Sequence, residues 1–560
     1  MKVLVLGGVA AGTKVAAKLM REDRSNEVTI LNKGKNISYA GCGLPYYVGH
    51  VIEDRDQLIV NTPEKYSKLT GVKVLTEVEA TKVDPVAKKV TAVDLNTQEE
   101  TVYDYDKLVI AVGASPVKPP IEGCDLENVF FMRTPDDAIR LRELVDAGGI
   151  KKAVVVGAGY IGLEIAENLK EMGIRPFVLD MAPQVLAPGF DKEMADYVEG
   201  KLVEAGIPVV TNVMVTGIEG DGKVEKVTTS KKAYKTDLVV LSAGIRPNTA
   251  FLNDTGLEMF KGTILTNEFG ETNIPDVYAA GDCAMVRNAL TGKPAWAPMG
   301  STANIAGRVI AQNMAGASLS YRGVLGTAVC KLPGLNVGRT GLTEVQAKAE
   351  GFDPVSVITV VDDKAHYYAG ASTFVIKMIA DRATERLLGV QVVGAGAVDK
   401  VVDVAVTGIM LKGTLTDLSD LDLAYAPPYS SAKDPVNMAG FAICNILDGN
   451  VKQVHWEDVE ELPENATVLD TRTDAEYARG HLECAMHIPL DSLRERMQEL
   501  PKDKVLYVHC QSGLRSYLAC RILMQYGYEC YNVSGGYGFY QNIMLDKQME
   551  REGTGPCGLK

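Results

Sequence analysis

Short apolar runs alternate with amphipathic stretches at the start of the chain, and the same pattern returns further along it. Residues 3–6 are continuously apolar, end at a glycine-rich turn and lead into an alanine-rich helical stretch that reaches about Arg21. Residues 153–156 and the turn after them repeat this arrangement. A short apolar run without polar alternation is typical of a strand buried on both faces of a parallel sheet. The pattern therefore predicts an α/β fold with two units of strand, glycine turn and helix.

Glycines occupy the turn of each unit. The first turn contains Gly7, Gly8 and Gly12, and the second contains Gly157, Gly159 and Gly162. Glycine lets the backbone turn tightly and approach a pyrophosphate, which the N-terminus of the following helix stabilises. The first turn departs from the usual G-x-G-x-x-G spacing, because Val9 stands where the second glycine is expected. Two such turns, about 150 residues apart, predict two Rossmann-like domains and two bound dinucleotides.

The residue after the next strand of each unit predicts how a ribose is bound. The strand at 176–179 ends at Asp180, and the strand at 28–31 ends at Asn32. A carboxylate at this point accepts a hydrogen bond from the ribose 2′-hydroxyl and repels a 2′-phosphate, so Asp180 favours NADH. Asn32 lacks the charge but can still bond to a hydroxyl.

Composition limits the class of protein. The chain has 560 residues, which suggests three or four domains, and its net charge of −14 argues against general affinity for nucleic acid. No apolar stretch approaches the roughly 20 residues of a membrane-spanning helix, so we expect a cytoplasmic protein without a membrane anchor. The ten cysteines form no C-x-x-C pair. We expect them to be mostly reduced, with neither a disulfide framework nor a metal site.

Three further segments, at 108–116, 242–248 and 272–282, carry a family resemblance. Together with the two glycine turns, and in this order, they resemble the flavoprotein disulfide reductases that have two dinucleotide-binding domains, over about residues 1–445. The cofactor residues that the resemblance implies are Asp282 for the ribityl chain of FAD, Gly113 and Gly244 in the strands that cross between domains, and Tyr160 and Glu164 for the nicotinamide of NADH.

The same resemblance implies the order of the domains. An FAD-binding domain would consist of two pieces, 1–113 and 243–322, with an NADH-binding domain inserted at 114–242. An α+β dimerisation domain would follow at 323–446. The chain is therefore expected to form a homodimer.

One cysteine lies where these reductases usually have a redox-active pair. Cys42 stands in the run Ser-Tyr-Ala-Gly-Cys-Gly-Leu-Pro that begins at Ser38. A single thiolate cannot form an internal disulfide, so its oxidised form must be a mixed disulfide with a small thiol or a sulfenic acid. The run resembles coenzyme A disulfide reductase and the related NADH oxidases and peroxidases. Ala10 stands where the oxidases and peroxidases usually carry a histidine, which favours the reductase.

Three cations lie at helical spacing shortly before this cysteine. Lys14, Lys18 and Arg21 are four and three residues apart, which places them on one face of the first helix. The resemblance implies that they hold the tail of coenzyme A by charge-assisted hydrogen bonds, together with Ser38 and Lys433. A solvated basic helix face is the alternative interpretation.

The segment at 424–435 resembles the signature of the family's dimerisation domain. Tyr425 corresponds to a tyrosine that reaches the cysteine of the partner subunit, and Tyr367 or its neighbour Tyr368 corresponds to a second. A phenol close to a sulfur can donate a proton or a hydrogen bond to a leaving thiolate. We favour Tyr367 for the second position, and aromatic packing in the core is the alternative role for all three.

A second reactive cysteine is predicted towards the end of the sequence. A buried strand at 505–508 leads into Cys510, and Arg515 follows where a helix begins. Residues 451–553 resemble a rhodanese α/β domain, in which the N–H groups of such a loop surround one sulfur and stabilise an anionic persulfide. The loop is one residue shorter than the C-x5-R loop of phosphatases, which favours sulfur transfer over dephosphorylation.

Taken together, these motifs resemble coenzyme A disulfide reductase–rhodanese fusions. The resemblance implies an NADH- and FAD-dependent reductase of coenzyme A persulfide, polysulfide and coenzyme A disulfide, with sulfane sulfur carried by the rhodanese domain and delivered by an upstream donor. Whether Cys510 passes sulfur to Cys42 directly or through coenzyme A stays open. An NADH oxidase or peroxidase that uses a sulfenate at Cys42, and a sulfurtransferase with a regulatory flavin module, are the alternatives.

Overall fold

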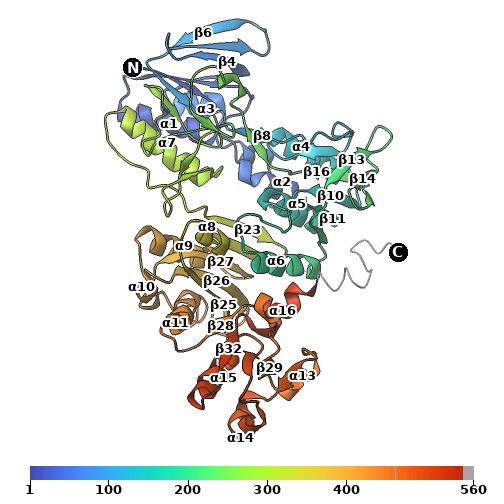
Figure 1. Ribbon diagram of the computed structural model, residues 1–560. Helices are drawn as coiled ribbons and strands as arrows, with labels where there is room; N and C mark the ends of the chain where they lie inside the picture. The colour runs from blue at the N-terminus through green and yellow to red at the C-terminus, as the bar shows by residue number, and fades with distance from the viewer. Residues whose placement is uncertain (461, 546–560) are drawn as a thin grey trace. The chain divides into compact units, whose positions relative to one another are not determined.

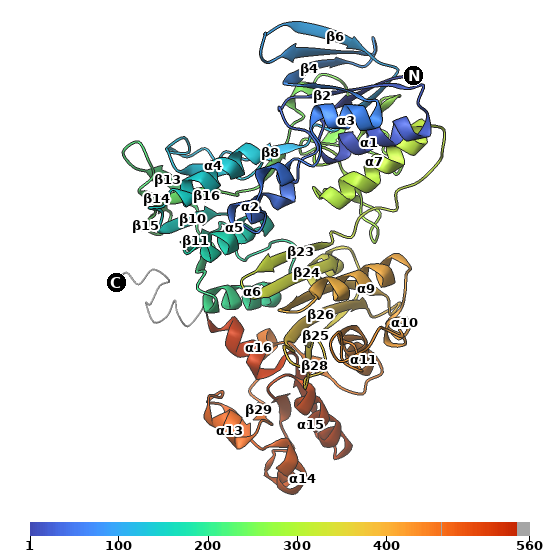
Figure 2. The same ribbon diagram turned by 180° about the vertical axis from the view of Figure 1, so that it is seen from behind.

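The computed structural model describes residues 1–460 and 462–545 (Figures 1 and 2). They form two compact units: residues 1–181 with 212–325, and residues 182–211 with the chain from 326 onwards. None of the helices formed by these described residues has the length and apolar character that crossing a membrane requires.

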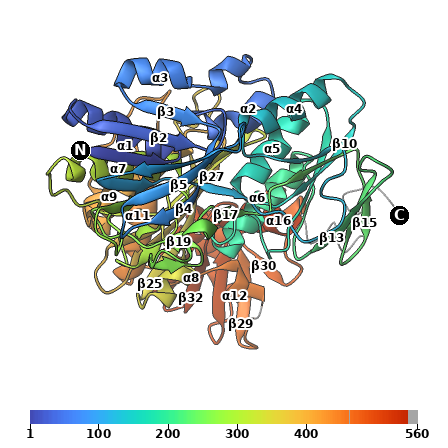
Figure 3. The ribbon, with the colours of Figure 1, turned by 90° about the horizontal axis from the view of Figure 1, so that it is seen from above.

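The first unit contains a parallel sheet of five strands near the N-terminus. Across the sheet, the strands are β20 (Val277–Ala279), β7 (Lys107–Ile110), β1 (Lys2–Leu6), β2 (Glu27–Asn32) and β3 (Lys73–Thr76). Helices α1 (Ala10–Glu22) and α7 (Gly300–Met314) lie side by side against it (Figures 1 and 3). Strands β7 and β20 are far apart in sequence but pair through Leu108 and Val277.

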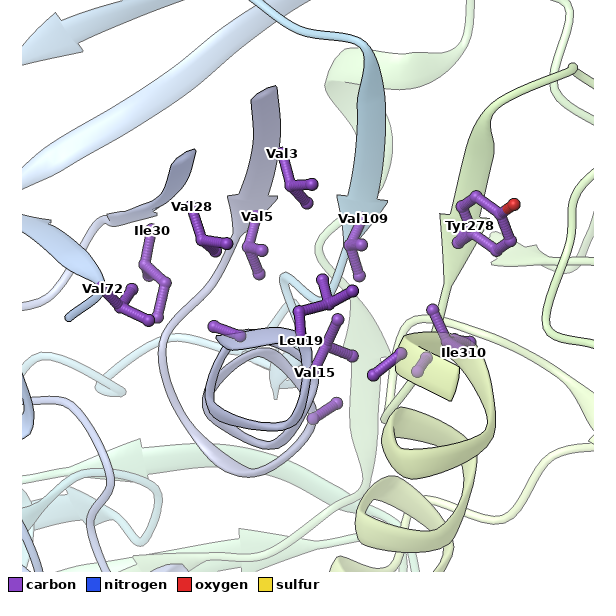
Figure 4. Close-up of a cluster of buried hydrophobic side chains, with 14 of the residues drawn as sticks. Val3, Val5, Val15, Leu19, Val28, Ile30, Val72, Val109, Tyr278 and Ile310 are labelled. Carbon is purple, nitrogen blue, oxygen red and sulfur yellow. The ribbon is translucent and has the colours of Figure 1, made fainter. Parts of the chain in front are cut away.

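The apolar run in β1 is explained by burial on both faces of this sheet. Successive side chains of a strand point to opposite faces, so Val3 and Val5 pack against α1 and α7, while Leu4 and Leu6 enter a second cluster (Figure 4). Leu19 of α1 is fully buried in the first cluster. The second cluster is closed by the antiparallel strands β4 (Val78–Asp84), β5 (Lys89–Asp94) and β6 (Glu100–Asp104).

The same unit contains a second parallel sheet. Strands β11 (Arg175–Leu179), β10 (Lys152–Val156), β16 (Leu238–Leu241) and β9 (Val129–Phe131) lie in this order. Its helices include α4 (Pro135–Asp146) and α5 (Tyr160–Glu171), and a hairpin sheet is formed by β13 (Val215–Glu219), β14 (Lys226–Thr229) and β15 (Ala233–Lys235). The chain crosses between the two sheets at β8 (Ala114–Pro116) and β17 (Ile245–Pro247), which pair antiparallel.

The second unit begins with an antiparallel sheet. Its strands are β23 (Ala328–Leu332), β24 (Leu335–Gly341), β27 (Leu387–Gly394), β26 (Thr373–Asp381) and β25 (Pro354–Asp362), so β25 is an edge strand. The helices of this region are α8 (Glu344–Ala349), α9 (Val398–Met410), α10 (Leu415–Ser419) and α11 (Pro435–Leu447). Helix α6 (Lys192–Glu204) belongs to the same unit.

A parallel sheet completes the second unit. Its strands are β28 (Gln453–Val454), β32 (Cys530–Val533), β31 (Val505–His509), β29 (Ala466–Asp470) and β30 (Ala485–His487). The helices are α12 (Trp456–Glu460), α13 (Asp474–Ala478), α14 (Leu493–Arg496), α15 (Leu514–Gln525) and α16 (Gly536–Ile543). The predicted fold class is confirmed: two Rossmann-like domains, an α+β domain and a further α/β domain. The predicted end of the last domain, at 553, lies outside the described residues.

Candidate active sites

The two glycine turns of the first unit have the same construction. Gly7 and Gly157 adopt φ values of 103° and 113°, which side chains other than glycine rarely tolerate. A Cβ atom on Gly12 would lie 1.8 Å from the carbonyl oxygen of Gly7, and one on Gly162 would lie 1.9 Å from that of Gly157. Glycine is therefore required at these points for the turn and for the close approach of helix and strand.

Gly159 needs a different explanation. Its φ is −81°, which any residue adopts, and a Cβ atom placed on it would meet no heavy atom within 4 Å. Neither backbone conformation nor packing inside the protein accounts for glycine at this position. It caps the N-terminus of α5, where backbone N–H groups face outwards, so the open space fits the pyrophosphate of a dinucleotide.

The polar residues that end or follow β2 and β11, Asn32 and Asp180, accept hydrogen bonds from the backbone of these turns. Asp180 accepts a hydrogen bond from the N–H of Ala158 at 2.6 Å, and Asn32 accepts one from the N–H of Gly8 at 2.9 Å. The amide nitrogen of Asn32 also donates to the carbonyl oxygen of Gly34 at 2.7 Å. A carboxylate has several acceptor sites, so Asp180 can accept a hydrogen bond from a ribose hydroxyl as well as from the backbone. At Asn32, a ribose hydroxyl would donate to the side-chain oxygen.

Glu164, the predicted nicotinamide residue, has an unexpected partner. The hydroxyl of Tyr46, in helix α2 (Leu44–Val48), donates to Oε1 of Glu164 at 3.0 Å. Burial, and then the charge of Glu167, raises the pKa of Glu164 to about 7, against the opposing effect of the Tyr46 hydrogen bond. A carboxyl group with this pKa can gain or lose a proton near neutral pH. Sequence reasoning did not single out Tyr46.

Cys42 is an exposed residue in the short helical turn η1 (Gly41–Gly43). Neighbouring protein atoms still restrict the hydration of its sulfur, and this burial is the main reason that the pKa of the thiol is raised. The carboxylates of Glu164 and Asp282 raise the pKa further, while the guanidinium of Arg133 lowers it. The protein groups around Cys42 therefore disfavour the thiolate.

Asp282, the predicted ligand of the ribityl chain, is paired with Arg133 at 2.9 Å. Arg133 follows the end of β9, and a Cβ atom on Gly113 would lie 3.4 Å from its Nη2 atom. Arg133 was not predicted, although the end of a parallel strand is where an α/β sheet usually binds ligands. The structure thus gathers Asp282, Gly113 and Arg133 in the surroundings of Cys42.

The residues predicted to bind coenzyme A differ in their surroundings. Lys18 forms an ion pair with Glu22 one turn further along α1, whereas the ion pairs found among the described residues include neither Lys14 nor Arg21. The stem of Lys14 lies against α7, because a Cβ atom on Gly307 would be 3.2 Å from the Cβ of Lys14. The three cations share a helix but are not equivalent.

Ser38 connects the cysteine segment to the first glycine turn. Its N–H donates to the carbonyl oxygen of Gly8 at 2.9 Å, and its φ of 47° is unusual for serine. Its hydroxyl oxygen accepts a weak hydrogen bond from Asn61 at 3.4 Å. Ser38 therefore lies beside the turn from which the basic helix starts.

The second unit exposes the predicted tyrosines. Tyr425 and Tyr367 are 50% and 68% exposed. A hydrogen bond between their side chains is the main reason that the pKa of Tyr425 is raised. Tyr425 and Tyr367 therefore lie next to each other, and the choice of Tyr367 over Tyr368 for the second position stays a prediction.

The loop after Tyr425 is anchored by a buried carboxylate. Asp434 accepts a hydrogen bond from Ser430 at 2.7 Å and pairs with Lys400 at 2.7 Å. Lys433, the remaining residue predicted to bind coenzyme A, is exposed next to this anchor.

Cys510 lies in a loop built around its sulfur. The residue is fully buried, and the N–H of Gly513 donates to its Sγ atom at 3.2 Å. The hydroxyl of Ser516, in the first turn of α15, lies 3.5 Å from the same atom. Hydrogen-bond donors directed at one sulfur stabilise a thiolate or a persulfide anion.

Arg515 is held at this loop by a residue that was not predicted. Its two terminal nitrogens each lie 2.7 Å from a carboxylate oxygen of Glu476, in a two-pronged ion pair. The guanidinium is the main cause that lowers the pKa of Glu476 to about 2. Glu476 also receives the N-terminal hydrogen bonds of α13, so it fixes Arg515 to a rigid element.

Three family models match successive segments of the chain. The family model for pyridine nucleotide-disulphide oxidoreductases matches residues 1–304, that for their dimerisation domain matches 327–435, and that for rhodanese-like domains matches 455–542. The solved structure of an NAD-dependent persulfide reductase from A. fulgidus is similar over 96% of this chain and 100% of its own, with a TM-score of 0.91 and 38% sequence identity.

Two relatives each match 78% of the chain. An NAD(P)H coenzyme A polysulfide/persulfide reductase from Pyrococcus horikoshii is 37% identical over 78% of this chain and 96% of its own length. An NADH oxidase from Methanocaldococcus jannaschii is 36% identical over 78% of this chain and 98% of its own length. The chain therefore belongs to the pyridine nucleotide-disulphide oxidoreductase family, and a rhodanese-like domain follows its dimerisation domain.

Proposed function

We propose that the protein is an NADH- and FAD-dependent reductase of coenzyme A persulfide, polysulfide and coenzyme A disulfide. The observation that carries the proposal is the presence of two differently built cysteine sites in one chain. Cys42 is exposed and lies near the nicotinamide residue Glu164, whereas Cys510 is enclosed by donors to its sulfur. The first suits electron transfer to a small disulfide, and the second suits the carriage of sulfur.

Cys42 is the proposed nucleophile of the reductive site. Its thiolate attacks the inner sulfur of coenzyme A persulfide, which forms a mixed disulfide with coenzyme A and releases hydrosulfide. With coenzyme A disulfide the leaving group is a coenzyme A thiolate. Two electrons from NADH then cleave the mixed disulfide and restore Cys42 and free coenzyme A.

The chain's own residues position these reactants. Bound FAD would supply the two-electron relay between NADH and the disulfide. Gly159 and Asp180 would hold the pyrophosphate and ribose of NADH, and Asp282 would hold the ribityl chain. Glu164, with a pKa of about 7 and tied to Tyr46, can hold a proton beside Cys42.

The residues proposed to hold coenzyme A belong mainly to the N-terminal part of the chain. Lys14, Lys18 and Arg21 supply positive charge along α1, and Ser38 lies at the turn from which that helix starts. Lys433 would add a further charge. Phosphate groups suit these side chains because charge-assisted hydrogen bonds are among the strongest.

We further propose that two copies associate through the dimerisation domain and that the protein works in the cytoplasm with an upstream sulfur donor. The exposed pair Tyr425 and Tyr367 supports association, since two large side chains that face solvent can reach the cysteine site of a partner subunit. Cys510 would take sulfane sulfur from the donor and pass it on as a persulfide.

The test is anaerobic NADH consumption with coenzyme A persulfide, coenzyme A disulfide or hydrogen peroxide as acceptor, and with oxygen in a parallel aerobic assay. Fast turnover with the coenzyme A species, lost in Cys42→Ser and retained in Cys484→Ser, is the expected result. Cys484 is the matched control because it is also exposed and has no motif around it. Cys510→Ser should keep coenzyme A disulfide reduction and lose persulfide formation from a sulfane donor.

An NADH oxidase is the second candidate, because similar proteins from Methanocaldococcus jannaschii and Enterococcus faecalis carry that name. Fast consumption of oxygen or peroxide, together with slow turnover of both coenzyme A species, would replace the proposal with this activity. Ala10 argues against it, since its methyl group cannot hydrogen-bond to a sulfenate.

A further inference from the structure

An edge strand of the dimerisation domain is hydrogen-bonded to residues of the rhodanese-like domain, and Ser534 makes two of these contacts. The N–H of Ile358 in β25 donates to the hydroxyl oxygen of Ser534 at 2.7 Å, and that hydroxyl lies 3.2 Å from the carbonyl oxygen of Ile358. The N–H of Gly535 donates to the same carbonyl at 3.1 Å. Ser534 is 1% exposed, so these bonds are shielded from water.

The residues after Ser534 form a turn that only glycine allows. Gly535 and Gly536 have φ values of 79° and 69°. A Cβ atom on Gly536 would lie 2.6 Å from the backbone nitrogen of Ser512 and 2.8 Å from the carbonyl oxygen of Cys510. The turn therefore lies directly against the loop that contains the second cysteine.

The helix that begins at this turn fixes the peptide groups of the cysteine loop. The N–H of Tyr537 donates to the carbonyl of Cys510 at 2.7 Å, and the N–H of Gly538 donates to that of Gln511 at 3.0 Å. A peptide group is planar, so holding its carbonyl also fixes the direction of its N–H. Two successive peptide planes are held in this way, immediately before the N–H of Gly513 that contacts the sulfur.

A second set of contacts joins the same two domains. His455 lies 3.0 Å from the hydroxyl of Ser356 in β25, and that hydroxyl donates to Glu344 at 2.6 Å. The indole N–H of Trp456, next to His455, donates to the carbonyl oxygen of Gly536 at 3.0 Å. Both sets of contacts therefore end at the glycine turn.

We propose that β25 of the dimerisation domain is a structural part of the sulfur-carrying site, and that Ser534 is the positioning residue that transmits its support to Cys510. The inference rests on the proposed role of Cys510 as a persulfide carrier. Donors stabilise a developing anion most when they are held in place before it forms. The rhodanese-like domain then works as a docked part of this chain, with its loop geometry set by its neighbour.

The experiment compares full-length Ser534→Ala with wild type. The rate of alkylation of Cys510 by iodoacetamide is measured across a pH series by peptide mass spectrometry, and sulfur transfer from thiosulfate to a thiol is measured in parallel. We expect the pH midpoint of alkylation to rise by about one unit, equivalent to about tenfold weaker stabilisation of the thiolate. Sulfur transfer should fall about tenfold, while NADH-dependent reduction of coenzyme A disulfide stays unchanged.

Ser492→Ala is the matched control, because Ser492 lies at α14 in the same domain and makes no capping hydrogen bond there. It should leave both readouts at wild-type values. Ser356→Ala removes a hydroxyl of the dimerisation domain itself and should move the midpoint in the same direction by a smaller amount. If Ser534→Ala does not fold, the alkylation midpoint of Ser356→Ala is the measurement that tests the proposal.

A lowered melting temperature with an unchanged alkylation midpoint, in both Ser534→Ala and Ser356→Ala, would overturn the inference and leave Ser534 as a purely structural contact. Failure of the proposed function looks different. Wild-type protein would then accumulate no persulfide on Cys510 with thiosulfate, whereas the alkylation midpoints of the variants would still report on the loop.

Discussion

The surroundings of the two cysteines have opposite effects on an anionic sulfur. Cys510 is buried, and its loop supplies an N–H at 3.2 Å and a nearby hydroxyl to the sulfur. Cys42 is exposed, and the groups around it raise the pKa of its thiol through restricted hydration and the charges of Glu164 and Asp282. A site that carries sulfur has to stabilise an anionic sulfur with the protein's own groups. A site that exchanges electrons can depend on what binds beside it.

The two sites also differ in which parts of the chain supply the residues around the cysteine. The Cys510 loop is stabilised by contacts within its own domain and by the neighbouring edge strand. The Cys42 site draws on residues from three separate segments, since Arg133, Glu164 and Asp282 all affect its thiol. A change at Glu476 should therefore act on one site only, and a change at Tyr46 only on the other.

The largest effect is expected for Glu476→Gln. The variant loses the charge that orients Arg515, so sulfur transfer by Cys510 should fall by a factor on the order of ten to one hundred, in line with the roughly 1.5–3 kcal/mol that charged hydrogen bonds contribute. Reduction of coenzyme A disulfide should not change. Thiosulfate-dependent transfer and NADH consumption, measured on the same preparation, test this. Equal loss of both activities would show that the two sites are not independent.

The same residue gives the rhodanese-like domain a pH dependence. The pKa of Glu476 is lowered to about 2, so its ion pair adds stability above the ordinary glutamate value of 4.5 and loses it as the pH falls towards 2. Wild-type stability should decline over this interval, and Glu476→Gln should flatten the decline. Fluorescence of Trp456 in a Trp296→Phe background isolates the domain, because the chain has two tryptophans.

Tyr46 provides a smaller and more specific test of the Cys42 site. Its hydrogen bond stabilises ionised Glu164, so Tyr46→Phe should raise the pKa of Glu164 above about 7 and move the corresponding midpoint of the pH–rate profile upwards by up to about one unit. Glu164→Gln should remove that titration. The profile of kcat/KM for NADH is the measurement, with Tyr47→Phe in the same short helix as control. A midpoint that stays or moves down contradicts the assignment.

Sequence patterns predict the local parts of these candidate sites but not the distant residues that contact them. The glycine turns, Cys42 and the Cys510 loop could be predicted because a backbone turn and its chemistry are encoded within about ten residues. Tyr46 and Glu164 are 118 residues apart, and Arg515 and Glu476 are 39 apart. Only the fold brings such pairs together. Ser534 could not be predicted for the same reason, since its partner Ile358 belongs to another domain.

The smallest effects are expected for two cations of α1, Lys14 and Lys18, which the sequence pattern alone does not distinguish. Lys18 is already paired with Glu22, whereas Lys14 belongs to no ion pair among those formed by the described residues. Lys14→Ala should therefore raise KM for coenzyme A disulfide about threefold to tenfold, and Lys18→Ala about twofold, because an exposed ion pair is worth roughly 1 kcal/mol or less. A small aromatic disulfide without phosphates serves as control substrate, and its KM should not change in either variant. Equal effects on both substrates, or no effect of Lys14→Ala, would make this surface of α1 a solvated helix face and would shift the search for the coenzyme A site towards Ser38 and Lys433.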